Sequence, residues 1–148
     1  MQMNIFYRRI SLLLISAAST LFFSCGSISE FSQYAYQQAV DLKVESLDLI
    51  SNADQPFEDY ADDVYSLKIG LSKAVEFAKG RPDNEISTKQ WEILTDENRN
   101  LLGGVLKRWE DEGSLSSGFV SEIKPIISDA FDTIIGLESG KIKPSEIQ

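Results

Sequence analysis

The chain has 148 residues, with 14 Lys and Arg against 23 Asp and Glu, a formal net charge of −9, and no histidine. This acidity argues against nucleic-acid binding, because contacts to phosphate depend on clustered Lys and Arg. The lack of histidine excludes histidine-based catalytic triads and histidine metal sites. A chain of this length predicts one folded domain.

The N-terminal residues have the pattern of an export signal. Arg8 and Arg9 precede an apolar run from Ile10 to Phe23, and no acidic residue occurs before Glu30. A helix of that run covers about 21 Å, which is short for a membrane span and typical of the apolar part of a signal peptide. We therefore predict a signal peptide over residues 1–24. Its removal leaves 12 basic and 23 acidic residues, a net charge of −11.

The end of this run, Leu21-Phe22-Phe23-Ser24-Cys25-Gly26, resembles the lipobox of bacterial lipoproteins. Ser24 is the small residue that the family has before its cysteine, whereas Leu21 lies one position earlier than usual. In that family the leader is cleaved before the cysteine, whose sulfur then carries a diacylglyceryl group. The resemblance implies a lipidated Cys25 on a tether over 25–29. It also implies a place on the extracytoplasmic side of the bacterial cell envelope, in the outer membrane if the cell has one. An uncleaved N-terminal anchor is the alternative.

Residues 30–140 predict an all-α domain, an antiparallel four-helix bundle, because apolar residues recur three and four apart and no segment alternates like a strand. We expect the first helix over Glu30–Ala53, with Ser29 as its N-cap. Pro56 opens the second helix, which ends at the sequence Lys79-Gly80-Arg81-Pro82.

The third helix of the bundle is expected to be broken. Ser87-Thr-Lys-Gln90 has the form of a capping box at its start. The polar run at 95–100 then separates a short piece from a longer one at about 101–112. Gly103 and Gly104 indicate close packing or a bend there, because glycine weakens a helix interior.

The fourth helix carries its apolar residues between Phe119 and Leu137. Pro125 lies inside this pattern and predicts a kink or a restart, because proline removes a backbone hydrogen bond. Gly140 ends the helix, and residues 141–148 form a short C-terminal tail.

Few patterns indicate a chemical site. Asp96-Glu97-Asn98-Arg99-Asn100 begins like a calcium loop, but Leu101 stands where that loop needs glycine and Lys107 where it needs a bidentate glutamate. We predict no catalytic residue, no metal site and no cofactor, and therefore no enzyme, since no base–nucleophile pair or phosphate loop is present.

Two further groups of side chains are weighed as sites. The first group is acidic and lies at the start of the second helix: Glu58, Asp59, Asp62 and Asp63. We expect these side chains to be solvated and favoured by the helix dipole, with a weak divalent-cation site as the alternative. Tyrosines with helical spacing are predicted to belong to the core, with a pocket as the alternative: Tyr34, Tyr36, Tyr60 and Tyr65.

Together the patterns predict a membrane-anchored extracytoplasmic lipoprotein that acts as an interaction or accessory subunit. In an up-down-up-down bundle, lipid on Cys25 holds one end at the membrane, with Lys141 and Lys143 close to it. The other end carries the turns 52–56 and 112–118. We expect an acidic tip there to face a basic protein partner, and it comprises Asp54, Glu58, Asp59, Glu110, Asp111 and Glu112.

Two other functions stay open at this point: a small-molecule-binding or metal-binding module, and an immunity-type inhibitor of a secreted toxin. An apolar cavity between the helices would favour the binding module. An exposed apolar patch would favour the protein partner.

Overall fold

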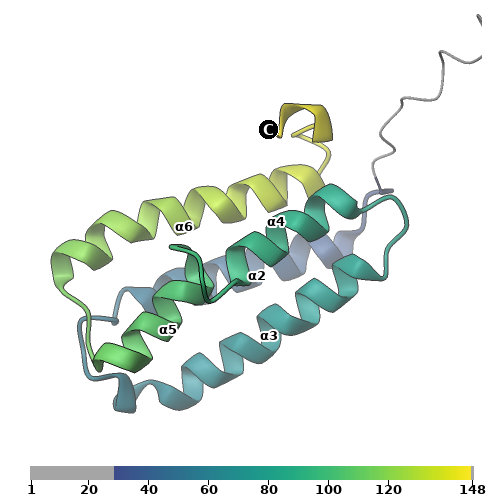
Figure 1. Ribbon diagram of the computed structural model, residues 1–148. Coiled ribbons are helices and arrows are strands. Elements are labelled where there is room, and N and C mark those ends of the chain that lie inside the picture. Colours follow the sequence, from purple (N-terminus) through teal and green to yellow (C-terminus); the bar gives the residue numbers. More distant parts are fainter. Residues whose placement is uncertain (1–28, 148) are drawn as a thin grey trace, which may run out of the picture.

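The structure is a computed structural model that describes residues 29–147 (Figure 1). Within that range the chain contains α-helices and two 3₁₀ turns but no strand, so the all-α prediction is confirmed. The α-helices are α2 (Gln33–Ile50), α3 (Ala61–Lys79), α4 (Glu85–Thr95), α5 (Leu102–Glu112) and α6 (Ser117–Glu138), and the 3₁₀ turns are η1 (Phe57–Asp59) and η2 (Pro144–Glu146). The predicted signal peptide and Cys25 lie outside the described residues.

The long helices lie side by side around one apolar core (Figure 1). Helix α2 packs against α3 and α6, and α4 packs against the same two helices. The core contains the fully buried side chains of Leu67 on α3, Leu94 on α4 and Phe131 on α6. Burial of aliphatic and aromatic side chains of this size contributes roughly 1.5–3 kcal/mol each.

The connection between α2 and α3 packs on α5 through Trp109. The indole Nε1 donates a hydrogen bond to the carbonyl of Gln55 at 3.0 Å, and the rings of Phe57 and Tyr60 lie 5.7 and 5.5 Å from the Trp109 ring. Trp109 is fully buried, so its N–H needs this partner. The indole thereby fixes the α2–α3 connection at one end of the molecule.

The predicted start of the first helix is wrong by three residues. Helix α2 begins at Gln33, and its N-cap is Ser32, whose Oγ accepts a hydrogen bond from the backbone N–H of Ala35 at 3.2 Å. Ser29, the predicted cap, instead donates its backbone N–H to the carbonyl of Asp83 at 3.0 Å. The last residue of the expected tether is therefore held by the α3–α4 loop.

The capping box predicted at Ser87 does not form. Helix α4 begins earlier, at Glu85, and Ser87 lies inside it with a buried side chain. The hydroxyl of Ser87 donates a hydrogen bond to the carboxylate of Glu138 on α6. Ser87 thus bonds to a residue of another helix and does not cap its own helix as the local sequence pattern predicted.

The second and fourth helices also differ in detail from expectation. Pro56 precedes the turn η1, and α3 begins only at Ala61. Helix α6 continues past Pro125 without a restart. The C-terminal tail is not free, because Ile142 donates its backbone N–H to the carbonyl of Gly136 at 3.0 Å and packs its side chain on that glycine.

The predicted break in the third segment is present, although its two pieces, α4 and α5, have the same length of 11 residues. The glycines that follow the break allow the connection to lie directly on the first turn of α5. A Cβ at Gly103 would lie within 3.0 Å of the backbone oxygen of Thr95, and a Cβ at Gly104 would lie within 3.0 Å of that of Arg99. Both positions need glycine because backbone, which cannot rotate away, occupies the space of a side chain.

Candidate functional site

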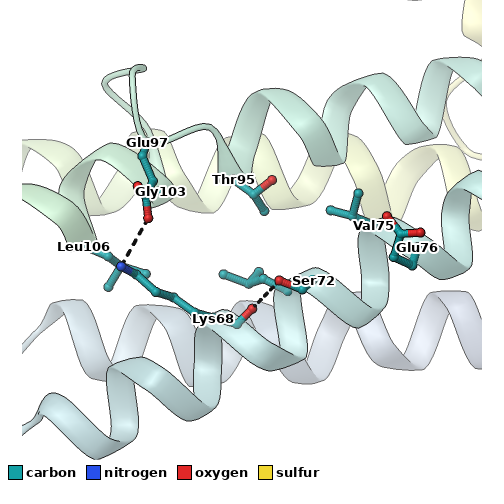
Figure 2. Close-up of a pocket in the computed structure, with 9 residues that line it drawn as sticks. Lys68, Ser72, Val75, Glu76, Thr95, Glu97, Gly103 and Leu106 are labelled. Atoms are coloured by element: carbon teal, nitrogen blue, oxygen red, sulfur yellow. Dashed lines mark hydrogen bonds and ion pairs between the residues drawn. The ribbon is translucent and has the colours of Figure 1, made fainter.

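A pocket of about 330 Å³ lies beside the break, between α3 and the α4–α5 connection (Figure 2). Its apolar lining consists of Leu71 and Val75 on α3 and Leu106 on α5. Its polar groups are Lys68, Ser72 and Glu76 on α3, and Thr95 and Glu97 at the end of α4 and in the connection. Small-molecule sites usually have mostly apolar walls with a few polar groups, and this pocket has more polar than apolar side chains in its lining.

Lys68 joins the three elements that surround this pocket. Its Nζ lies 3.3 Å from a carboxylate oxygen of Glu97 in the connection and 3.4 Å from one of Glu110 on α5. The hydroxyl of Ser72 donates to the backbone carbonyl of Lys68 at 2.9 Å, as Figure 2 shows. The hydroxyl of Ser72 is thus bonded to a backbone carbonyl and not to a side-chain base.

The two turns of the predicted acidic tip adjoin each other at one end of the molecule. Phe57 donates its backbone N–H to the carbonyl of Gly113 at 2.7 Å, and Leu115 donates its own to the carbonyl of Ala53 at 2.8 Å. These bonds join the α2–α3 connection to the α5–α6 connection. The six predicted residues of the tip lie in or beside these connections, at Asp54, Glu58, Asp59, Glu110, Asp111 and Glu112.

The negative charge of this tip is unevenly distributed. The three acids on α5 are each paired with a base: Glu110 with Lys68 at 3.4 Å, Asp111 with Lys107 at 3.0 Å, and Glu112 with Arg108 at 2.8 Å. The hydrogen bond from Lys107 to Asp111 also raises the pKa of Lys107. By contrast, Glu58 and Asp59 have exposed side chains and form no ion pair within residues 29–147. The uncompensated charge therefore lies on the α3 side of the tip.

A buried ion pair at the opposite end was not found by sequence reasoning. Arg81 pairs with Glu138, whose carboxylate also accepts the hydroxyl of Ser87. Arg81 donates a second hydrogen bond, at 2.6 Å, to the carbonyl of Glu30. The side chains of Arg81 and Glu138 are only 11% and 3% exposed, so the pair is largely withdrawn from water. The sequence could have indicated its burial, because Glu138 lies four residues after the buried Ile134 and therefore on the apolar face of α6.

The calcium-like sequence forms a closed polar loop. One carboxylate oxygen of Asp96 accepts hydrogen bonds from the backbone N–H and the side-chain amide of Asn98, at 2.9 and 3.1 Å. The backbone N–H of Asn98 is the main cause that lowers the pKa of Asp96, with Arg99 adding to it. Within residues 29–147, no three Cys, Asp or Glu side chains are grouped so that they could hold a metal ion.

The four tyrosines do not gather around one cavity. Tyr60 packs on Trp109, whereas Tyr34 and Tyr65 are 61% and 67% exposed. Tyr34 lies on α2 and contacts Phe77 of α3 edge-on, with 4.8 Å between the ring centroids. Two of the predicted core tyrosines are thus surface residues.

None of the helices between residues 29 and 147 has the length and apolarity needed to cross a bilayer. Comparisons of the chain with protein-family models, with curated proteins and with solved structures found no match.

Proposed function

We propose that the protein is a lipid-anchored accessory subunit of the bacterial cell envelope. In this proposal residues 30–140 are a four-helix bundle whose third helix, α4 with α5, is broken. Lipid on Cys25 holds one end at the membrane. The acidic tip at the other end binds a basic protein partner. The observation that carries the proposal is the adjoining of the α2–α3 and α5–α6 connections, because it gathers the tip at the end away from Ser29.

The polarity follows from the contacts of Ser29. Ser29 bonds to Asp83 and lines a small hollow together with Pro144 of the C-terminal tail. Cys25 lies four residues earlier in the chain, and four residues span at most about 14 Å. A lipid on Cys25 therefore keeps this end close to the membrane surface. Lys141 and Lys143 in the tail would each contribute about 1 kcal/mol beside anionic lipid.

Incorporation of labelled palmitate tests the anchor. We expect the protein to take up the label in cells and Cys25→Ser to abolish it, because the thiol is the group that is acylated. Two or more acyl chains make release from the membrane negligible, since each buried CH₂ contributes about 0.8 kcal/mol. Label that persists in Cys25→Ser would show that the lipobox assignment is wrong.

The role of the tip is tested with two variants that change the net charge equally. Glu58→Gln with Asp59→Asn removes two unpaired carboxylates, and Glu110→Gln with Asp111→Asn removes two that are paired with lysines. The binding partner is first isolated by crosslinking and pull-down of the tagged lipoprotein. We expect the first variant to slow association with that partner more than the second, because charges that are not neutralised locally steer encounter best.

An association rate that neither variant alters, and that salt does not change in the wild type, would remove the tip from the mechanism. The screening length is only about 8 Å at physiological ionic strength, so electrostatic steering must weaken as salt is added.

The pocket beside the break favours a second candidate, a small-molecule-binding module. Its test is Ser72→Phe, which places an aromatic ring at the pocket wall next to Leu71 and Val75. Ligands found by a small-molecule screen against the wild type should lose affinity for this variant. Ligands that bind both proteins equally would locate the binding site elsewhere.

A further inference from the structure

Helix α3 has an exposed apolar stripe on the face turned away from the core. Tyr65, Ile69 and Phe77 are 67%, 39% and 37% exposed, and Lys73 completes the four-residue spacing between them. Helix α3 packs against α2 and α4 on its other sides, so this face is open along the edge of the molecule (Figure 1). Tyr34 of α2 extends the stripe through its contact with Phe77.

Two hollows adjoin the stripe. A shallow hollow of about 440 Å³ is bordered by Tyr65, Ile69 and Lys73, and it shares Lys68, Ser72 and Glu76 with the pocket beside the break. A further hollow of about 310 Å³ lies between α2 and α3, next to Tyr34 and Gly70. Ridges with grooves beside them are the surface that a second helix packs against.

Acidic side chains lie at the N-terminal end of the stripe, whereas its middle carries Lys73 and adjoins Lys68 and Glu76. Glu58, Asp59 and Asp62 lie at the start of α3 or just before it, are exposed, and form no ion pair within the described residues. Asp62 is three residues before Tyr65 and seven before Ile69, so it shares their face of the helix. A partner that covers Tyr65 and Ile69 would bring its own charged groups next to these carboxylates. Lys73 is the one basic member of the stripe, two turns beyond Tyr65.

We propose that this stripe is the docking site for a basic amphipathic α-helix of another protein, an inference that rests on the proposed function and specifies its partner. The apolar face of the partner helix covers Tyr65 and Ile69 and places side chains in the adjoining hollows. Its Lys and Arg residues meet Asp62 on α3 and Glu58 and Asp59 of the tip. A second copy of this chain fits less well, because each copy is strongly acidic, with a net charge of −9 over all 148 residues and −11 without residues 1–24.

The test uses two synthetic helical peptides with the same leucine face, one with lysine and the other with glutamate at every polar position. The protein is purified from cells that express the full chain and is captured on a sensor through a C-terminal tag. We expect the lysine peptide to bind at least about tenfold more tightly than the glutamate peptide. Binding should weaken as salt is raised to about 0.5 M.

Ile69→Asp separates docking on the stripe from general attraction. The variant adds a negative charge, so attraction to charge alone would strengthen binding of the lysine peptide. Loss of the apolar contact should instead weaken it about tenfold or more. Ile126→Asp is the matched control, because Ile126 is 51% exposed on α6, across the molecule from α3. It should leave the affinity unchanged within about twofold.

Tyr65→Ser provides a second variant that leaves the core intact, since the side chain of Tyr65 is 67% exposed. Equal or tighter binding of the lysine peptide to Ile69→Asp and Tyr65→Ser would overturn the proposal. A dimer of the wild type that Ile69→Asp dissociates, seen by light scattering, would overturn it in favour of a second copy.

Failure of this inference and failure of the proposed function give different results. If peptide binding requires Glu58 and Asp59 but not Ile69, the acidic tip keeps its role and the stripe loses its own. If Cys25→Ser retains palmitate label, the anchor is wrong while the result for Ile69 stands.

Discussion

Substituting alanine for Gly104 in α5 tests the close packing at the break most directly. In an ordinary helix, Gly→Ala gains up to about 1 kcal/mol, because alanine has less conformational freedom to lose and the higher helix propensity. At Gly104 the new Cβ would lie within 3.0 Å of the backbone oxygen of Arg99, and Gly103 has the same relation to Thr95. The structure therefore predicts the opposite sign of the effect.

The size of the effect follows from the movement that the new methyl group requires. The connection between α4 and α5 would have to move away from α5 by roughly 1 Å, and overpacking of this kind costs about 1–3 kcal/mol. We expect Gly104→Ala to lower the free energy of unfolding by that amount. For a domain of this size the melting temperature should fall by roughly 4–12 °C.

The control for this substitution is Gly118→Ala in α6. Nothing lies within 4 Å of a Cβ at Gly118, so this variant should be neutral or more stable than the wild type. Urea unfolding of residues 29–148, followed by circular dichroism at 222 nm, measures both. If Gly104→Ala stabilises the protein as much as Gly118→Ala does, the connection does not pack on α5 as described.

Three further predictions concern the stability of the helical core. Residues 29–148 should fold alone and be mostly helical by circular dichroism. Leu71→Ala should lower the free energy of unfolding in urea by about 2–5 kcal/mol, because Leu71 is only 3% exposed. A loss under about 0.5 kcal/mol would contradict the burial of Leu71. Arg81→Ala should lower the free energy of unfolding by about 3–5 kcal/mol, because Glu138 stays buried without its partner. The double variant Arg81→Met with Glu138→Leu should recover most of that loss. An equal loss in the single and double variants would show that the unpaired buried charge is not the cause. Asp96→Asn should destabilise the protein above about pH 4, since the pKa of Asp96 is lowered in the folded state and folding favours the charged form. The difference in unfolding free energy from the wild type should shrink as the pH falls below about 3.8. A difference that does not depend on pH would exclude this cause.

The sequence alone determined the features that act over a few residues. The polar run at 95–100 predicted the break between α4 and α5, because six polar residues in succession leave no apolar face to bury. The end of α3 at Lys79 was likewise predictable from Gly80 and Pro82. The adjoining turns at the tip were expected from the number of segments and their short connections.

Only the tertiary structure decided which distant groups meet. The hydroxyl of Ser87 could cap its own helix or pair with Glu138, 51 residues away, and packing of α4 on α6 selected the second partner. Lys68 likewise neutralises Glu110, 42 residues away, whereas Glu58 and Asp59 of the tip form no ion pair within the described residues. Helical periodicity specifies the face on which a side chain lies, because it depends on neighbours three and four residues away. The partner of a charge depends on which faces the packed helices bring together, and that is set by the core as a whole.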